Sequence, residues 1–227
     1  MKIISNEYEP GTRIYPFAES IEYVRAVGRG EEPATLRLYQ PAPNVAFGRR
    51  DEHNPGFETA THASRSHGFQ PLVRPVGGHA AGYHAGCLVV DHFQPAADAV
   101  SGNNLRFQVF GDMYARVLRA LGASAAVGEI PGEYCPGEYS VHAEVGDRKI
   151  KIVGTAQRVV AGAWWFSAGI VVEHDPRLTA VTEDVYRALN LPLDPATVGA
   201  LTDANPRATV AMVQDATLAE LKKMGFH

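Results

Sequence analysis

One of the two cysteines, together with a lysine that follows it in the chain, has the clearest potential for chemistry. Cys135 lies in a tight Tyr-Cys-Pro-Gly corner at residues 134–137, and Lys151 lies in a basic segment further along. A thiol is a good nucleophile because a small fraction is ionised near neutral pH, and a nearby cation raises that fraction. Cys135 is therefore a candidate nucleophile, although cysteines inside cells are more often inert small hydrophobic residues.

A glycine-rich segment, RPVGGHAAGYHAG at residues 74–86, is the second candidate feature. Gly77 and Gly78 would let backbone N–H groups approach a bound group closely, since glycine adopts positive φ without a steric cost. The segment matches neither the phosphate-binding loop of nucleotide hydrolases nor the dinucleotide-binding turn. A glycine-rich hairpin loop without a ligand is the alternative interpretation.

The lysine occurs in a predicted strand, DRKIKIVGTAQR at residues 147–158. Side chains alternate along a strand, so Lys149 and Lys151 share one face while the two isoleucines share the other. This alternation is also typical of a solvated strand face. Gly154 indicates a close backbone approach near Lys151, and Lys149 does not have the same spacing to it. We therefore predict that Lys151 is functional and that Lys149 is not.

The remaining thiol and the histidines give no clear metal motif. Cys87 lies inside an apolar strand pattern, where a thiol is usually inert. His79, His84 and the two cysteines show none of the spacings of zinc ligands. We predict no metal site.

The composition predicts a single globular domain over residues 1–227, without a separate C-terminal accessory domain. The chain is 45% hydrophobic with a net charge of −4, which gives no electrostatic reason to expect nucleic acid or an anionic membrane surface as partner. It lacks a signal-peptide pattern at its first residues, and no apolar run approaches the ~20 residues of a membrane span. These features predict a cytoplasmic protein with free thiols and no membrane association.

Hydrophobic periodicity predicts an α+β fold. Apolar spacing of three and four residues indicates helices, alternation indicates strands, and residues 69–93 have the pattern of two strands joined by a glycine-rich loop. Hairpin-joined strands with helices before, between and after them favour a mixed, largely antiparallel sheet. Helices are predicted over 16–33, 104–121, 178–189 and 208–224, and strands over 35–40, 44–50, 139–145, 149–160 and 163–172.

Three motifs together resemble the lipoyl/octanoyl transferase and lipoate-protein ligase family. They are RPVGGHA at 74–80, YCPGEYSV at 134–141 and KIVGTAQR at 151–158, and the resemblance extends from about residue 36 to about residue 172. It implies the fold shared with biotin protein ligases, in which helices flank a central mixed, largely antiparallel sheet. It also implies a tunnel for a C8 acyl chain and transfer of that octanoyl or lipoyl group to a lysine of a lipoyl domain.

The corner around Cys135 looks most like the cysteine-dependent amidotransferase branch of that family. The resemblance makes Cys135 the nucleophile and Lys151 the residue that holds the acyl carbonyl, with no cofactor required. It implies that lipoyl domains of 2-oxoacid dehydrogenases accept the acyl group, and that the glycine cleavage H protein or an acyl carrier protein donates it. The substrate-binding positions that it implies are Arg74, Gly77, Gly78, His79, Gly154, Thr155 and Ala156.

Two other functions remain open. An ATP-dependent lipoate-protein ligase would need ATP and Mg²⁺, but Arg74 is followed by proline where ligases often have a second arginine. Tyr83-His84 also stands where ligases have a His-Asp pair. The other alternative is a non-catalytic protein that binds an acyl group or a lipoyl domain. For the acyl tunnel, Leu72, Val90 and the aromatic residues 164–166 are candidate walls.

Overall fold

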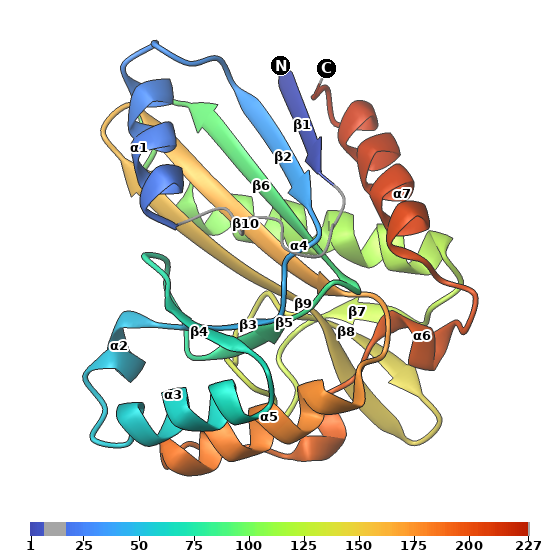
Figure 1. Ribbon diagram of the computed structural model, residues 1–227. Coiled ribbons are helices and arrows are strands. Elements are labelled where there is room, and N and C mark those ends of the chain that lie inside the picture. Colours follow the sequence, from blue (N-terminus) through green and yellow to red (C-terminus); the bar gives the residue numbers. More distant parts are fainter. Residues whose placement is uncertain (7–16, 227) are drawn as a thin grey trace.

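The computed structural model describes residues 1–6 and 17–226, and a seven-stranded sheet forms its centre (Figure 1). The strand order is β1-β2-β6-β10-β9-β8-β7. β1 pairs with β2 in parallel and the other neighbours pair antiparallel, so the prediction of a mixed, largely antiparallel sheet is confirmed. The strands are β1 (Lys2–Asn6), β2 (Thr35–Tyr39), β6 (Cys87–Pro95), β7 (Ala125–Val127), β8 (Val141–Val145), β9 (Arg148–Val160) and β10 (Ala163–Val171).

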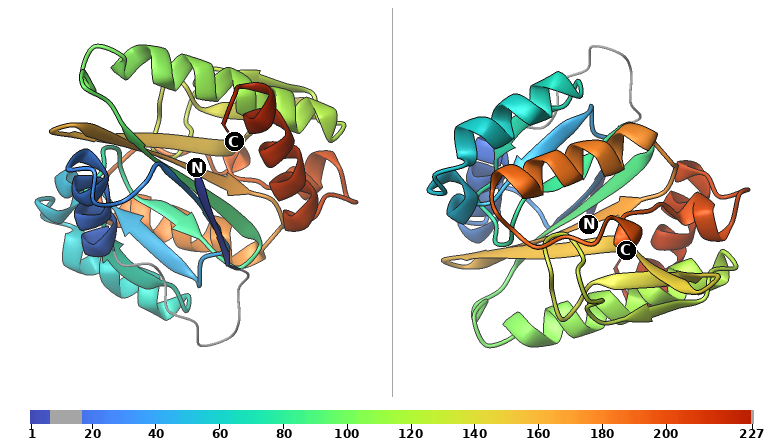
Figure 2. Two further views of the ribbon diagram at one scale, coloured as in Figure 1. Left: turned by 90° about the horizontal axis from the view of Figure 1, so that it is seen from above. Right: turned by 90° about the horizontal axis from the view of Figure 1, so that it is seen from below.

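A second sheet of three strands, in the order β4-β3-β5, carries the glycine-rich loop between β4 and β5. Helices α3 and α5 cover this small sheet, while α4 and α7 lie on one face of the large sheet and α1 lies on the other (Figures 1 and 2). The small-sheet strands are β3 (Asn44–Phe47), β4 (Gln70–Val73) and β5 (Ala81–Tyr83). The helices are α1 (Phe17–Gly28), α2 (Arg49–Glu52), α3 (Phe57–Ser66), α4 (Asn103–Ala120), α5 (Pro176–Ala188), α6 (Leu201–Ala204) and α7 (Val210–Lys223), with a 3-10 turn η1 (Pro195–Thr197).

The predicted helices and strands are present, with shifted ends. The first helix lies within the predicted segment 16–33 and ends at Gly28, one of the two glycines expected to stop it, and Pro16 at the start of that segment lies outside the described residues. Arg49 and Arg50 were predicted to end a strand, but they begin the short helix α2. The glycine-rich segment holds a short strand, β5, because its residues 81–83 pair with β3. Helix α3 and strands β1 and β7 were not predicted.

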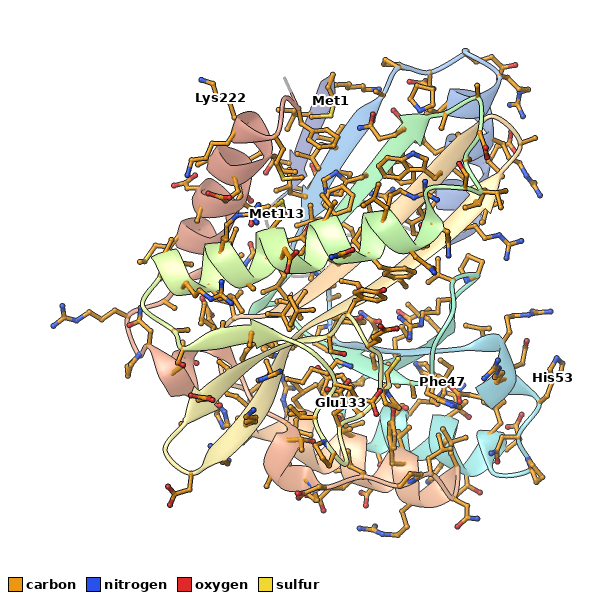
Figure 3. The ribbon with its side chains drawn as sticks, turned by 180° about the vertical axis from the view of Figure 1, so that it is seen from behind. Met1, Phe47, His53, Met113, Glu133 and Lys222 are labelled. Carbon is orange, nitrogen blue, oxygen red and sulfur yellow. The ribbon has the colours of Figure 1, made fainter. Side chains whose placement is uncertain are left out.

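Helix α4 shows how the sequence pattern produces the main core. Its buried residues Phe110, Met113, Tyr114 and Val117 recur at helical spacing and face the large sheet, and Figure 3 shows Met113 on this inner side of the helix. Gly122, at φ 85°, follows the end of α4. Each such large apolar side chain stabilises the fold by about 1.5–3 kcal/mol through burial.

His92 is a titratable side chain inside this core. It is fully buried on β6, and its ring centroid lies 4.5 Å from that of Phe110. Neither ring nitrogen has a hydrogen-bond partner among the described residues. Desolvation lowers the pKa of His92 to about 3, so the imidazole stays neutral in the folded protein over most of the acidic range.

The first prediction concerns stability at acidic pH. The unfolded chain protonates His92 below about pH 6.5, whereas the folded chain does so only near pH 3, so its contribution to stability is lost as pH falls through this window. Between pH 7.5 and pH 5, the wild type should lose about 2 kcal/mol more unfolding free energy than His92→Leu, measured by urea titration. Other titrating groups are common to both proteins, so parallel pH dependence in the two would contradict the prediction.

Candidate active site

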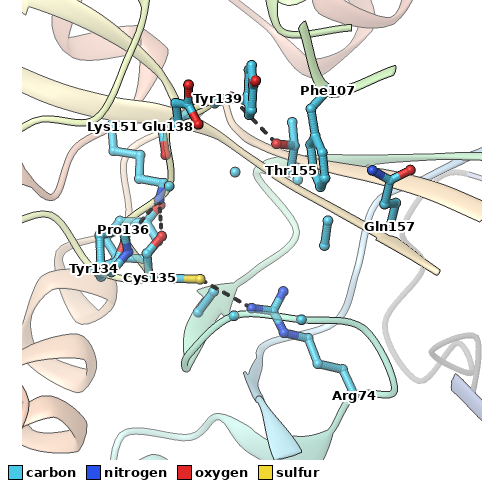
Figure 4. A pocket seen from close by; sticks show the side chains of 18 of the residues that line it. Arg74, Phe107, Tyr134, Cys135, Pro136, Glu138, Tyr139, Lys151, Thr155 and Gln157 are labelled. Atoms are coloured by element: carbon cyan, nitrogen blue, oxygen red, sulfur yellow. Dashed lines mark hydrogen bonds between the residues drawn. The ribbon is translucent and has the colours of Figure 1, made fainter. Parts of the chain in front are cut away.

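A cavity of about 430 Å³ lies where the large sheet, the glycine-rich loop and residues 130–140 meet (Figure 4). Cys135 and Lys151, the two residues predicted to act in catalysis, both line it. Every predicted binding residue lines it as well except His79, which reaches the site through its backbone. The predicted lining residues are Arg74, Gly77, Gly78, Gly154, Thr155 and Ala156.

The ammonium of Lys151 is buried and has three hydrogen-bond acceptors. Its Nζ donates to Glu133 Oε1 at 2.9 Å, to the carbonyl of Tyr134 at 2.9 Å and to the carbonyl of Cys135 at 2.6 Å. An ammonium has three N–H donors, so all of them are used. Lys149, by contrast, is exposed on the same strand. In this structure Lys151 therefore binds the backbone of the cysteine corner.

Glu133 completes this arrangement, and sequence reasoning missed it. Its side chain is fully buried, and Oε1 also accepts from Ser140 Oγ at 2.6 Å and from Gly137 N at 3.2 Å. Oε2 accepts from Ile130 N at 3.3 Å. One carboxylate thus ties together the segment that carries the nucleophile and neutralises the buried lysine. An acidic residue two positions before the thiol was the available signal.

Cys135 itself adopts an unusual backbone conformation. Its φ is 44°, in the left-handed region that costs a non-glycine residue about 1–2 kcal/mol. Its N–H donates to the hydroxyl of Tyr186 in α5, and that hydroxyl donates to the carbonyl of Ala80 at 2.9 Å. Tyr186 therefore joins the cysteine corner to the glycine-rich loop. Its position on the apolar stripe of α5 gave no sign of this role.

The sulfur of Cys135 faces two N–H donors from the glycine-rich loop. The backbone N–H of His79 lies 3.2 Å from Sγ, and Arg74 Nη2 lies 3.4 Å from it and 2.7 Å from the carbonyl of His79 (Figure 4). A guanidinium and a backbone amide are thus both aimed at the sulfur. The imidazole of His79 is bonded instead to the buried carboxylate of Asp51, with Nδ1 and Oδ1 2.7 Å apart.

The floor of the cavity comes from a pair of glycines. Gly154 on β9 and Gly169 on β10 are cross-strand partners, and both line the cavity. Two facing positions without side chains leave a hollow on the sheet. Ala156 continues this floor, and the rings of Tyr83 and Phe107 are among its side walls. Gly169 was not predicted as a site residue.

The residues predicted as tunnel walls lie outside the large cavity, although Trp165 lines a smaller cavity next to it. Leu72, Val90 and residues 164–166 do not line the large cavity. Val90 and Phe166 belong to the core beneath α4, because strand alternation places them on the sheet face opposite to Gly169. The alternation of side chains along a strand predicted which residues share a face of the sheet, but it did not indicate which face holds the cavity.

Cys87 behaves differently from Cys135. It is completely buried, and desolvation raises its pKa to about 12, so it remains an unreactive thiol. Among the described residues, no three His, Cys, Asp or Glu side chains are grouped as metal ligands would be. Every helix in that part of the chain is also too short or too polar to cross a bilayer.

The second prediction uses the two adjacent glycines as a matched pair. A Cβ on Gly78, at φ 97°, would lie 2.6 Å from Cys135 Sγ, whereas one on Gly77 would have no described atom within 4 Å. Gly78→Ala should displace the sulfur from its donors and slow alkylation of Cys135 by iodoacetamide at pH 7 at least tenfold, since hydrogen bonds to a charged group contribute about 1.5–3 kcal/mol. Gly77→Ala should react at the wild-type rate. Similar rates in the two variants would contradict this steric account.

The third prediction compares the two lysines of β9. Lys151→Met leaves the carboxylate of Glu133 buried without its cation, which should lower the unfolding free energy by about 3–5 kcal/mol. Lys149→Met changes an exposed side chain and should stay within about 0.5 kcal/mol of wild type. Chemical denaturation measures both. A small loss for Lys151→Met would show that this ion pair does not hold the cysteine corner.

The fold is that of the lipoate-protein ligases. The structure is similar to that of a lipoate-protein ligase A bound with ATP, with a TM-score of 0.70 and 19% identity over 98% of this chain and 85% of that chain. It is also similar to a putative lipoate protein ligase from T. acidophilum, with a TM-score of 0.67 and 20% identity over 98% of this chain and 85% of the other. At these identities the likeness shows the fold alone.

The family follows from the sequence. Residues 15–222 match the model of the lipoyl protein ligase A/B catalytic domain, and the chain belongs to this family. It is 30% identical over 137 residues to an octanoyl-[GcvH]:protein N-octanoyltransferase of Geobacillus kaustophilus, covering 60% of this chain and 47% of the relative. A protein of the same name from Exiguobacterium sibiricum is 31% identical over 134 residues, which cover 58% of this chain and 46% of the relative.

The chain spans about half the length of the curated relatives it matches. The predicted family and fold are thus confirmed.

Proposed function

We propose that this protein transfers an octanoyl or lipoyl group to a lysine of a lipoyl domain through a thioester on Cys135. The observation that carries the proposal is the sulfur of Cys135, which faces two N–H donors beside a cavity of about 430 Å³ that has several aromatic residues in its walls. The names of the relatives from Geobacillus kaustophilus and Exiguobacterium sibiricum, octanoyl-[GcvH]:protein N-octanoyltransferase, support the same reaction class.

In the first half-reaction the thiolate of Cys135 attacks the carbonyl of an octanoyl amide. An S–C bond forms, the C–N bond of the amide breaks, and the amine of the donor lysine leaves with the thiol proton. Covalent catalysis of this kind divides one slow amide exchange into two easier steps. The acyl group arrives already bonded to a carrier, so the reaction requires neither ATP nor a metal ion.

In the second half-reaction the amine of the acceptor lysine attacks the thioester. A new C–N bond forms, the C–S bond breaks, and a proton from the amine returns to the sulfur. Negative charge develops on the carbonyl oxygen in both steps, and donors fixed in place before the reaction stabilise it best. The His79 N–H and the Arg74 guanidinium, which lie beside the sulfur, are the groups we assign to this role.

We assign Lys151 a different role from the predicted one of holding the acyl carbonyl. Its three donors are used by Glu133 and by the carbonyls of residues 134 and 135. It therefore fixes the peptide that carries the nucleophile. Its effect on the acyl group is then exerted through the position of Cys135.

The cavity accounts for binding of the acyl chain. Burying about six or seven methylenes at ~0.8 kcal/mol each stabilises the bound chain by roughly 5 kcal/mol without a charged contact. A chain shorter by two methylenes would bind about tenfold to twentyfold more weakly. Aromatic walls such as Phe107 and Tyr139, stacked with ring centroids 5.5 Å apart, provide the apolar surface.

For the partners, we propose lipoyl domains as acceptors and the glycine cleavage H protein as donor. The names of the relatives from Geobacillus kaustophilus and Bacillus velezensis contain the H protein, GcvH, as the octanoyl carrier. An octanoyl amide on that protein is the substrate of the first half-reaction as proposed above. An acyl carrier protein would instead supply a thioester.

The fourth prediction tests the thioester. Incubation with an octanoylated H protein should add one octanoyl group to the intact mass of the wild type, and hydroxylamine should remove it. Cys135→Ala should show no adduct and lose transfer to a lipoyl domain by at least a thousandfold, whereas the matched Cys87→Ala should still form the adduct. Equal labelling of wild type and Cys135→Ala, or transfer that occurs only with added ATP, would refute the proposed function.

A further inference from the structure

A second, smaller cavity adjoins the large one. It measures about 30 Å³, the volume of roughly one water molecule, and it shares two lining residues, Arg74 and Tyr83, with the large cavity. Its remaining walls come from both sheets and include Tyr39, Ala46, Val76, Val89 and Trp165. Most of these side chains are apolar, so the space beyond Arg74 and Tyr83 would accept more hydrocarbon if it were open.

Tyr83 is held in place by the backbone of the large sheet. A Cβ on Gly169 would lie 2.4 Å from Cε1 of the Tyr83 ring and 2.8 Å from its hydroxyl oxygen, so the ring rests directly on the bare backbone of β10. Its own strand packs closely against α5, because a Cβ on Gly82 would lie 2.6 Å from Cδ1 of Leu178. Tyr83 also pairs with Asn44 in the small sheet. The ring therefore has a fixed position beside the floor made by the glycine pair.

The other shared residue, Arg74, is committed to the nucleophile. Its Nη2 is hydrogen bonded to the sulfur of Cys135 and to the carbonyl of His79. A change at Arg74 would thus alter the chemistry of the sulfur as well as the shape of the cavity. No hydrogen bond joins Tyr83 to the sulfur among the described residues, although the tyrosine interacts electrostatically with Arg74 and Cys135. A change at Tyr83 therefore alters the partition between the cavities more selectively than a change at Arg74, provided that thiol reactivity is measured alongside.

We infer that Tyr83 sets the maximum length of the acyl chain, by closing the large cavity at the point where the small one begins. This inference rests on the proposed function, because the chain in question is the one carried by Cys135. Each methylene that finds apolar space strengthens binding by ~4-fold, so the preferred length is the longest chain that fits. A methylene that meets the fixed ring must displace the ring or leave the cavity, so it adds nothing to the affinity for the chain.

The experiment measures the chain-length profile of thioester formation. Full-length protein is exposed to p-nitrophenyl esters of straight-chain acids with six to fourteen carbons, and the initial rate of adduct formation on Cys135 is followed by intact mass. The rate of alkylation by iodoacetamide, which has no acyl chain, serves to normalise each variant for thiol reactivity. Tyr83→Ala removes the ring, and Tyr83→Phe is the matched control that keeps the ring and removes only the hydroxyl.

We expect the wild type and Tyr83→Phe to share one profile, with a maximum near eight carbons. In Tyr83→Ala the maximum should move by at least two carbons, and the rate with twelve carbons relative to eight should rise at least tenfold. If Tyr83→Ala is not folded by circular dichroism, Tyr83→Leu should show the same shift.

Three results would overturn the inference. In the first, the profile of the folded small-residue variant coincides with that of the wild type at equal iodoacetamide reactivity. In the second, the profile of Tyr83→Phe shifts as far as that of Tyr83→Ala. Both of these results leave the octanoyl adduct of the wild type intact, and with it the proposed function. In the third result the wild type forms no hydroxylamine-sensitive adduct with any ester, which overturns the proposed function together with the inference.

Discussion

The buried ammonium of Lys151 is the interaction on which the site depends. A charge without partners in a protein interior is very unfavourable, and here the carboxylate of Glu133 and two backbone carbonyls compensate it. Both carbonyls belong to the peptides around Cys135, whose left-handed backbone persists only because its surroundings determine it so completely. The same hydrogen bonds that satisfy the lysine therefore hold Cys135 in a strained conformation.

The second constraint comes from the small sheet. Its glycine-rich loop supplies the donors that face the sulfur, and three contacts fix that loop in relation to the rest of the molecule. Tyr186 of α5 bonds to Ala80, Asp51 of α2 bonds to the imidazole of His79, and a Cβ on Gly48 would overlap the carbonyl of Gly78. Residues far apart in sequence thus position the loop whose His79 N–H faces the sulfur. Lys151 of the large sheet positions Cys135, and the loop of the small sheet supplies the N–H donors around its sulfur.

Much of this architecture could be predicted from the sequence, because the decisive patterns are local. The apolar stripe of α4 and the alternation of β9 and β10 follow helical and strand periods, and the family resemblance brought Cys135 and Lys151 to one site. Helix α3 was missed because its sequence, FETATHASRS, is mostly polar and buries only small side chains. β1 was missed because most of its residues are exposed and show no alternation of buried positions.

The residues that sequence reasoning missed at the site share a physical feature, which is that their function depends on contacts distant in the chain. Tyr186, whose hydroxyl accepts a hydrogen bond from the N–H of Cys135, lies 51 residues from it in the chain. The hollow beside Cys135 arises from Gly169 only because β10 places it opposite Gly154. A local pattern shows that another group can approach a glycine closely, but it does not identify that group. For Gly169 the group is the ring of Tyr83, and the packing of the two sheets brings it there. The candidate residues Cys135 and Lys151 could thus be found from motifs, whereas the cavity that they line is a property of the assembled fold.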